Sequence, residues 1–151
     1  MSPPYTVVVP FDDSAGSREA LWKAARLVSV LANPRLVVLH VTCLNAPARV
    51  PGLDGVEKAS NSDIRRASGD QVDACKSYLA KLEVAYEWFA IEGHGTPGQV
   101  IESFIKEKVP ECDLVIMGTR GLTGLKKWVF LLAPCFPRAC VACGPLQISI
   151  A

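Results

Sequence analysis

The sequence has little of what several functional classes require. It contains two histidines among 151 residues, so acid–base catalysis by histidine has few candidate side chains. No stretch approaches the run of about 18 apolar residues that crosses a membrane as a helix. The 16 Lys and Arg residues nearly balance the 15 Asp and Glu residues, for a formal net charge of +1. Because proteins that hold a nucleic-acid backbone carry a clear basic excess, neither nucleic acid nor membrane is an expected partner.

Catalytic signature motifs are also missing. The chain has no Gly-x-Ser-x-Gly nucleophile elbow, no His-Glu-x-x-His zinc motif, and no glycine-rich loop ending in Gly-Lys-Ser/Thr. We therefore expect no dedicated catalytic residues, with slow hydrolysis of a bound nucleotide as the most that the sequence supports.

The cysteines do not form a complete metal-site pattern. Cys140 and Cys143 make one Cys-x-x-Cys pair, whereas structural zinc commonly uses two such pairs, and His40 and His94 lie far away in sequence. We expect no metal site. The first residues, Met1-Ser2-Pro3-Pro4-Tyr5, lack the basic and apolar segments of a secretory leader. A cytoplasmic protein with reduced thiols is expected.

Apolar β-branched runs alternate with helical patterns along the chain. A segment from about 44 to 60, which contains Pro47, Pro51, Gly52 and Gly55, is predicted to be a flexible loop. The predicted strands are 5–11, 35–41, 84–91, 112–117 and 146–150, and the predicted helices are 17–32, 62–83 and 99–108.

This alternation predicts the fold class. Nearly continuous apolar strands are typical of a parallel sheet that is covered on both faces. Strand–helix–strand units then connect through right-handed crossovers. We predict a single α/β domain over residues 1–151, with a doubly wound, Rossmann-like, mainly parallel sheet flanked by helices.

Ligands of such sheets bind beyond the carboxyl ends of the strands. Asp12 follows the first strand, and its carboxylate suits a ribose hydroxyl. The backbone of Val41, near the end of the second strand, suits an adenine edge. The alternative for Asp12 and the neighbouring Asp13 is a turn and helix-start role, because acidic side chains favour the positive end of a helix.

A glycine-rich loop follows the fourth strand. Gly118, Gly121 and Gly124 permit close approach of backbone N–H groups to an anion, and Arg120 or Lys126 would add positive charge. This spacing favours a phosphate site. A loop that merely turns the chain explains the same glycines, so both interpretations stay open on pattern alone.

Three segments resemble the universal stress protein family. They are Val8-Val9-Pro10-Phe11-Asp12-Asp13-Ser14, then Leu39-His40-Val41, and Asp113-Leu114-Val115-Ile116-Met117-Gly118-Thr119-Arg120-Gly121, and the likeness runs from residue 5 to about 128. The resemblance implies a five-stranded sheet, a stress-response role and a homodimer paired through the last strand, 146–150. It also implies ATP or AMP as ligand, with or without magnesium. The residues implied to bind it are Pro10, Phe11, Asp12 (ribose), Val41 (adenine), Met117, Gly118, Arg120 and Gly121 (phosphates).

The sequence departs from this family pattern after the glycine loop. Leu131 and Leu132 stand where nucleotide-binding members carry Gly followed by Ser or Thr, and Leu has neither a hydroxyl nor the freedom of Gly. Pro134 and Pro137 interrupt the helix that the family has next, so 131–142 is predicted to be irregular. Either divergence or a reading-frame or cloning error over 129–145 explains this. The alternative function is a dimeric interaction module of the same family that binds no nucleotide.

Overall fold

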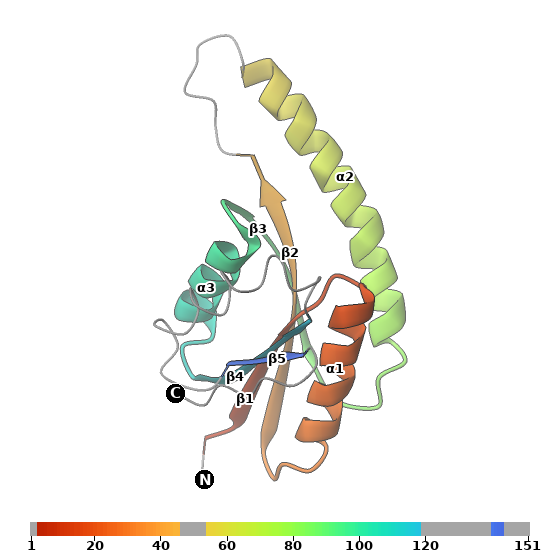
Figure 1. Ribbon diagram of the computed structural model, residues 1–151, viewed down its shortest axis with the longest axis vertical. Coiled ribbons are helices and arrows are strands. Elements are labelled where there is room, and N and C mark those ends of the chain that lie inside the picture. Colours follow the sequence, from red (N-terminus) through yellow and green to blue (C-terminus); the bar gives the residue numbers. More distant parts are fainter. Residues whose placement is uncertain (1–2, 46–53, 119–139, 144–151) are drawn as a thin grey trace.

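The computed structural model describes residues 3–45, 54–118 and 140–143, with only the backbone described at 54–57 and 140–143. Strands and helices alternate along these residues, as Figure 1 shows. In chain order the elements are β1 (Tyr5–Pro10), α1 (Ala15–Val28), β2 (Pro34–Leu44), α2 (Asp54–Leu79), β3 (Glu87–His94), α3 (Pro97–Lys108), β4 (Cys112–Gly118) and β5 (Cys140–Cys143).

The five strands form one parallel sheet in the order β3-β2-β1-β4-β5. β1 lies at the centre, where Val8 pairs with Val37 of β2 on one side and with Val115 of β4 on the other. The chain moves outward from β1 to β2 and β3, and then returns to the opposite side of β1 for β4. This order is that of a doubly wound α/β fold, which confirms the predicted fold class.

Helices cover both faces of the sheet (Figure 1). Alternate side chains of a strand point to opposite faces, so Val7 and Val9 pack in the cluster with α1 and α2, while Val8 packs with α3. All three valines are fully buried. The nearly continuous apolar pattern of β1 therefore follows from burial on both faces.

Residue types that favour helix N-caps stand at the starts of α1 and α3. Ser14 caps α1, and its hydroxyl accepts a hydrogen bond from the Ser17 backbone N–H at 3.3 Å. Thr96 and Gln99 form a capping box at the start of α3, where Pro97 occupies the first turn. None of the helices in the described ranges is long and apolar enough to cross a membrane.

Helix α2 is longer than predicted. It begins at Asp54, so the second half of the expected 44–60 loop is helical, and Leu44 belongs to β2. The prediction of helix from residue 62 missed this start because the first two turns of α2 carry polar and small residues with no apolar periodicity. Residues 46–53 lie outside the described part of the chain.

The fifth strand also differs from the prediction. β5 is formed by Cys140–Cys143, beside β4, with Val141 paired to Ile116. The expectation of an irregular segment over 131–142 is therefore wrong for its last three residues, since a short run of small and β-branched residues after Pro137 can extend along β4. The predicted strand 146–150, its role in a dimer, and residues 131–139 lie outside the described residues.

Candidate functional site

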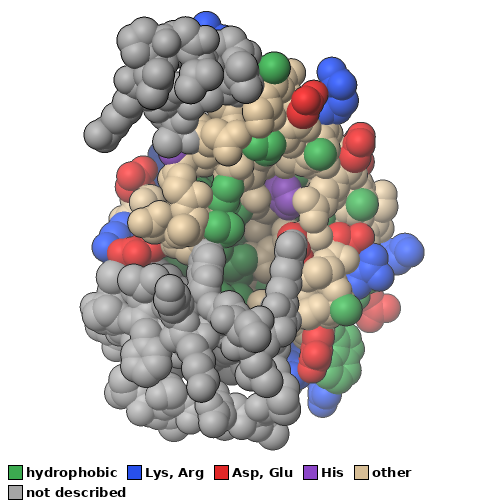
Figure 2. Space-filling view, turned by 45° about the horizontal axis from the view of Figure 1, so that its top comes forward, with side chains coloured by type: hydrophobic (Ala, Val, Ile, Leu, Met, Phe, Trp, Pro, Cys, Tyr) green, Lys and Arg blue, Asp and Glu red, His purple; other side chains and the backbone are tan. Residues whose placement is uncertain are grey.

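The strand order defines where a ligand site is expected. β1 connects toward β2 while β4 lies on its other side, so the carboxyl ends of β1 and β4 flank the point where the order reverses. Figure 2 looks obliquely onto this end of the molecule. Near the centre of that view, hydrophobic side chains lie along one side of a hollow and a histidine lies at its other side, while acidic and basic side chains lie mostly around the periphery.

The loop after β1 holds the Asp12 carboxylate in a defined orientation. Asp12 Oδ1 accepts hydrogen bonds from the Ser14 backbone N–H at 3.1 Å and from the Ser14 hydroxyl at 2.6 Å. The Asp12 backbone N–H in turn donates to Ser17 Oγ at 3.4 Å. Asp12 therefore holds the turn that precedes α1, whose N-cap is Ser14. The same bonds fix a carboxylate at the carboxyl end of the central strand.

Asp13 has a different role from Asp12. Its backbone is left-handed, with φ of 60°, and its two carboxylate oxygens accept bonds from Arg18 Nε and Nη2, both at 2.8 Å. The hydrogen bond from Arg18 holds the pKa of the Asp13 carboxyl below its usual value. The Arg18 guanidinium also lies over the Tyr78 ring, 5.1 Å from its centroid. Asp13 thus joins the loop to α1 and, through Arg18, to α2.

Gly118, at the end of β4, is required by close packing. A Cβ atom built on Gly118 would lie 2.1 Å from the Gly16 carbonyl carbon and 2.4 Å from the Ser17 nitrogen, both in the first turn of α1. No positive φ is recorded at this glycine, unlike Gly95. Gly118 therefore lets the end of β4 touch the start of α1, and a substitution here would disturb the fold as well as any ligand.

The structure brings part of the predicted site together. Phe11 is buried, and Pro10, Met117 and Gly118 are half-buried at the adjoining ends of β1 and β4. Val41 is half-buried near the end of β2, the other neighbour of β1. The remaining predicted residues, Arg120, Gly121 and Gly124, lie outside the described residues, as do Leu131 and Leu132.

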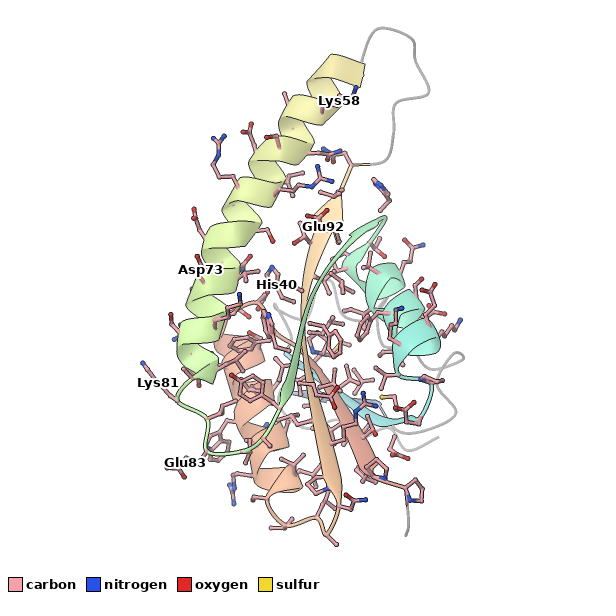
Figure 3. All side chains as sticks on the ribbon, turned by 180° about the vertical axis from the view of Figure 1, so that it is seen from behind. His40, Lys58, Asp73, Lys81, Glu83 and Glu92 are labelled. Atoms are coloured by element: carbon pink, nitrogen blue, oxygen red, sulfur yellow. The ribbon has the colours of Figure 1, made fainter. Side chains whose placement is uncertain are left out.

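Behind this loop lies His40, which the sequence marked only as part of the Leu39-His40-Val41 segment. Its side chain is 2% exposed and sits between β2 and α2, as Figure 3 shows. His40 Nδ1 is 3.1 Å from the Phe11 carbonyl oxygen, and Nε2 is 3.1 Å from Ser68 Oγ on α2. Because a carbonyl only accepts, Nδ1 carries the proton and Nε2 accepts from Ser68. Ser68 Oγ also contacts Thr42 Oγ1.

A second contact from α2 reaches the loop directly. Gln71 Nε2 donates a hydrogen bond of 2.6 Å to the Asp12 carbonyl oxygen. In the sequence, Gln71 is one of many polar residues on a polar helix, and nothing marks it as different from its neighbours. The signal that finds it is three-dimensional, because the two residues are 59 positions apart.

The buried titratable groups near the loop are held in neutral forms. Burial lowers the pKa of His40, although the hydrogen bond to Phe11 opposes this effect. Burial also raises the pKa of the Cys75 thiol to about 11, which disfavours the reactive thiolate. Among the described residues, no group of three or more His, Cys, Asp and Glu side chains is placed to hold a metal ion. The neutral His40 and Cys75 side chains are suited to holding backbone positions.

Comparison with known proteins identifies the family. The family model described as the universal stress protein family matches residues 5–132. This chain belongs to the universal stress protein family. A comparison with curated proteins gave no match. The family match ends at Leu132.

Solved structures of universal stress proteins share the fold. The universal stress protein UspA from Lactobacillus plantarum superimposes with a TM-score of 0.67 at 20% identity, covering 94% of this chain and 99% of its own. A family protein of Arabidopsis thaliana with AMP bound has a TM-score of 0.55 at 20% identity, covering 92% of each chain. A universal stress protein in complex with cAMP has a TM-score of 0.52 at 18% identity, covering 98% of this chain and 100% of its own.

Proposed function

We propose that this universal stress protein binds or senses an adenine nucleotide, ATP or AMP, and has no dedicated catalytic role. The observation that carries the proposal is the fixed position of Asp12, whose carboxylate is oriented by Ser14 at the switch point of the sheet. An oriented carboxylate accepts hydrogen bonds from vicinal ribose hydroxyls without further ordering of the loop, which reduces the entropic cost of binding. The relatives crystallised with AMP and with cAMP support the ligand class.

The proposed contacts follow the three strand ends. Asp12 meets the ribose and the Val41 backbone meets the adenine, with Pro10 and Phe11 leading the chain into this loop. Met117 and Gly118 lie at the end of β4 toward the phosphates. Arg120 and Gly121, which follow in sequence, complete the phosphate contacts of this proposal, with or without magnesium.

A specific observation supports a second function. Leu131 and Leu132 remove the hydroxyl and the glycine that would contact the outer phosphates, and the family match ends there. The alternative is a cytoplasmic stress-response protein that acts as a single-domain homodimer, paired through 146–150, and binds no nucleotide. An intermediate outcome, AMP bound more tightly than ATP, would agree with a site that lacks its outer phosphate contacts.

Calorimetric titration with AMP and ATP tests the proposal, with Asp12→Asn as the critical variant. Asn keeps an Oδ1 acceptor for Ser14 but replaces the second oxygen and the charge, so the loop should stay in place. We expect the variant to bind AMP about tenfold more weakly, as for loss of a charge-assisted hydrogen bond. The matched control is Asp63→Asn, at an exposed carboxylate on α2 whose side chain is 77% accessible.

Two results would contradict the proposal. Folded wild-type protein that takes up neither nucleotide supports the interaction module. Equal AMP affinity of the wild type, Asp12→Asn and the Asp63→Asn control would remove Asp12 from the site.

A further inference from the structure

The backbone of the β1–α1 loop is held on all sides by neighbouring elements. The Phe11 N–H donates to the Leu39 carbonyl at 2.8 Å, and the Phe11 carbonyl accepts from His40. The Asp12 N–H donates to Ser17 Oγ, and the Asp12 carbonyl accepts from Gln71. Four consecutive backbone polar groups therefore have partners on β2, α1 and α2.

Two of these contacts hold the backbone of Asp12 itself, and the one from Gln71 comes from α2. It fixes the peptide unit that joins Asp12 to Asp13, and this unit leads to Ser14, whose N–H and hydroxyl hold the Asp12 carboxylate. Asp13, the next residue, is in the left-handed region with φ of 60°, so the chain turns sharply at this unit. If this peptide unit rotated, Ser14 would shift relative to Asp12 and the carboxylate would lose the bonds that orient it.

The α2 residues that reach the loop lie on one face of the helix. Ser68 and Gln71 are three positions apart, which places them on neighbouring turns. Ser68 contacts His40 and Thr42, and His40 holds the Phe11 carbonyl. One face of α2 therefore supports two successive carbonyl groups of the loop, one through His40 and one directly through Gln71.

Desolvation alone does not require a glutamine at this position. The Gln71 bond to Asp12 is only partly buried. A partly exposed carbonyl can be hydrogen-bonded by water at little net cost, so replacing Gln71 should change the overall stability only slightly. What water cannot supply is a fixed donor direction, and a fixed donor is what a preorganised binding loop needs.

We infer that Gln71 is a positioning residue of the nucleotide site, which orients the Asp12 carboxylate for the ribose hydroxyls from its place on α2. This inference rests on the proposed function. It assigns α2, which contributes none of the residues carried over from the family resemblance, an indirect part in ribose recognition, through Asp12. Gln71 should affect only the portion of the binding energy that depends on the ribose hydroxyls.

The test compares AMP with 2′,3′-dideoxy-AMP by calorimetry on the full-length protein. Gln71→Ala and Gln71→Met both remove the donor, and Met keeps the length of the side chain if Ala disturbs folding. We expect each to bind AMP about fivefold more weakly, with affinity for the dideoxy nucleotide unchanged, as for loss of one neutral hydrogen bond. Combining Gln71→Met with Asp12→Asn should give no loss beyond that of Asp12→Asn alone.

The controls separate failure of this inference from failure of the proposed function. Asp73→Ala, at an exposed α2 position, should retain wild-type affinity for both ligands. If wild-type protein prefers AMP but the Gln71 variants keep that preference, or lose affinity for both nucleotides equally, Gln71 does not position Asp12. If wild-type protein binds neither ligand, or binds both equally, the Asp12–ribose contact itself is wrong and the inference fails with it.

Discussion

The two ends of the sheet use side chains to join distant elements in different ways. At the amino end, Arg35 of β2 forms ion pairs with Glu87 of β3 and with Glu111, before β4, and all three side chains are at least 26% exposed. At the carboxyl end, His40 and Gln71 make hydrogen bonds to backbone carbonyls, and His40 is 2% exposed.

This contrast shows which contacts position a site. Exposed ion pairs exchange readily with water and salt, so they fix neither partner tightly and stabilise only modestly. A buried or partly buried donor aimed at a carbonyl fixes the backbone itself. The amino end therefore ties strands together, whereas the carboxyl end holds the β1–α1 loop in one geometry.

The largest expected effect is at Gly118, where the carboxyl end has no space for a side chain. Gly118→Val would place carbon atoms within 2.4 Å of the α1 backbone, which cannot move without disrupting the first turn of the helix. We expect a loss on the order of 3 kcal/mol in the free energy of unfolding, measured by urea denaturation.

The matched control for this substitution is Gly69→Ala in α2. No atom lies within 4 Å of an added Cβ at Gly69, and alanine favours helix over glycine. Gly69→Ala should therefore leave the protein equally stable or raise the unfolding free energy by up to about 1 kcal/mol. Similar losses in the two variants would contradict the packing role of Gly118.

A smaller effect is expected for His40, and it depends on pH. Because the pKa of His40 is lowered in the folded protein, the unfolded chain binds a proton below about pH 6.5 that the folded chain does not. The His40 contribution to stability is therefore complete above that pH and is lost as the pH falls toward the folded-state pKa. We expect the unfolding free energy of the wild type to decline from about pH 7.5 to pH 5 more steeply than that of His40→Gln.

The difference between wild type and variant is the informative quantity here. Carboxylates such as Asp13 and Glu87, whose pKa values are lowered by Arg18 and Arg35, also contribute less to the unfolding free energy in acid. This loss is the same in the wild type and in His40→Gln. Equal slopes for the wild type and His40→Gln would show that His40 titrates normally and is not held neutral.

The smallest effect is expected at the amino end. Arg35→Ala removes both ion pairs but leaves exposed carboxylates that water solvates, so the loss should be about 1 kcal/mol or less. Urea denaturation at low and high salt would show this loss shrinking as salt is added. A salt-independent loss as large as that at Gly118 would overturn the distinction between the two ends.

Much of the fold could be predicted from the sequence because its signals are local. The apolar run Val7–Val9 indicates a doubly buried strand, and Ser14 and Thr96 mark helix starts by capping chemistry. The start of α2 could not be found in this way, because its first turns are polar and give no periodic signal. The position of β5 at Cys140–Cys143 depends on pairing with β4, which is a long-range contact.

The candidate site likewise has features that local sequence signals reveal and features that depend on long-range contacts. The position of Asp12 at the carboxyl end of β1 could be predicted, because it follows a strand directly and lies in a recognisable motif. Gln71 could not be predicted, since its role depends on how α2 packs over the sheet. Gly118 was predicted to let backbone N–H groups approach an anion. Its contact with Gly16 shows a packing requirement that no local pattern reveals.

The most direct test of the account is to map AMP binding on ¹⁵N-labelled protein by NMR. The account predicts saturable shifts concentrated in the amides of residues 11–14, 41–42 and 117–118, and in the Gln71 side-chain NH₂. Arg35, Glu87 and Glu111 at the amino end should not shift. Shifts that gather at the amino end, or a folded protein whose spectrum AMP leaves unchanged, would contradict the claim that the fixed β1–α1 loop is a nucleotide site.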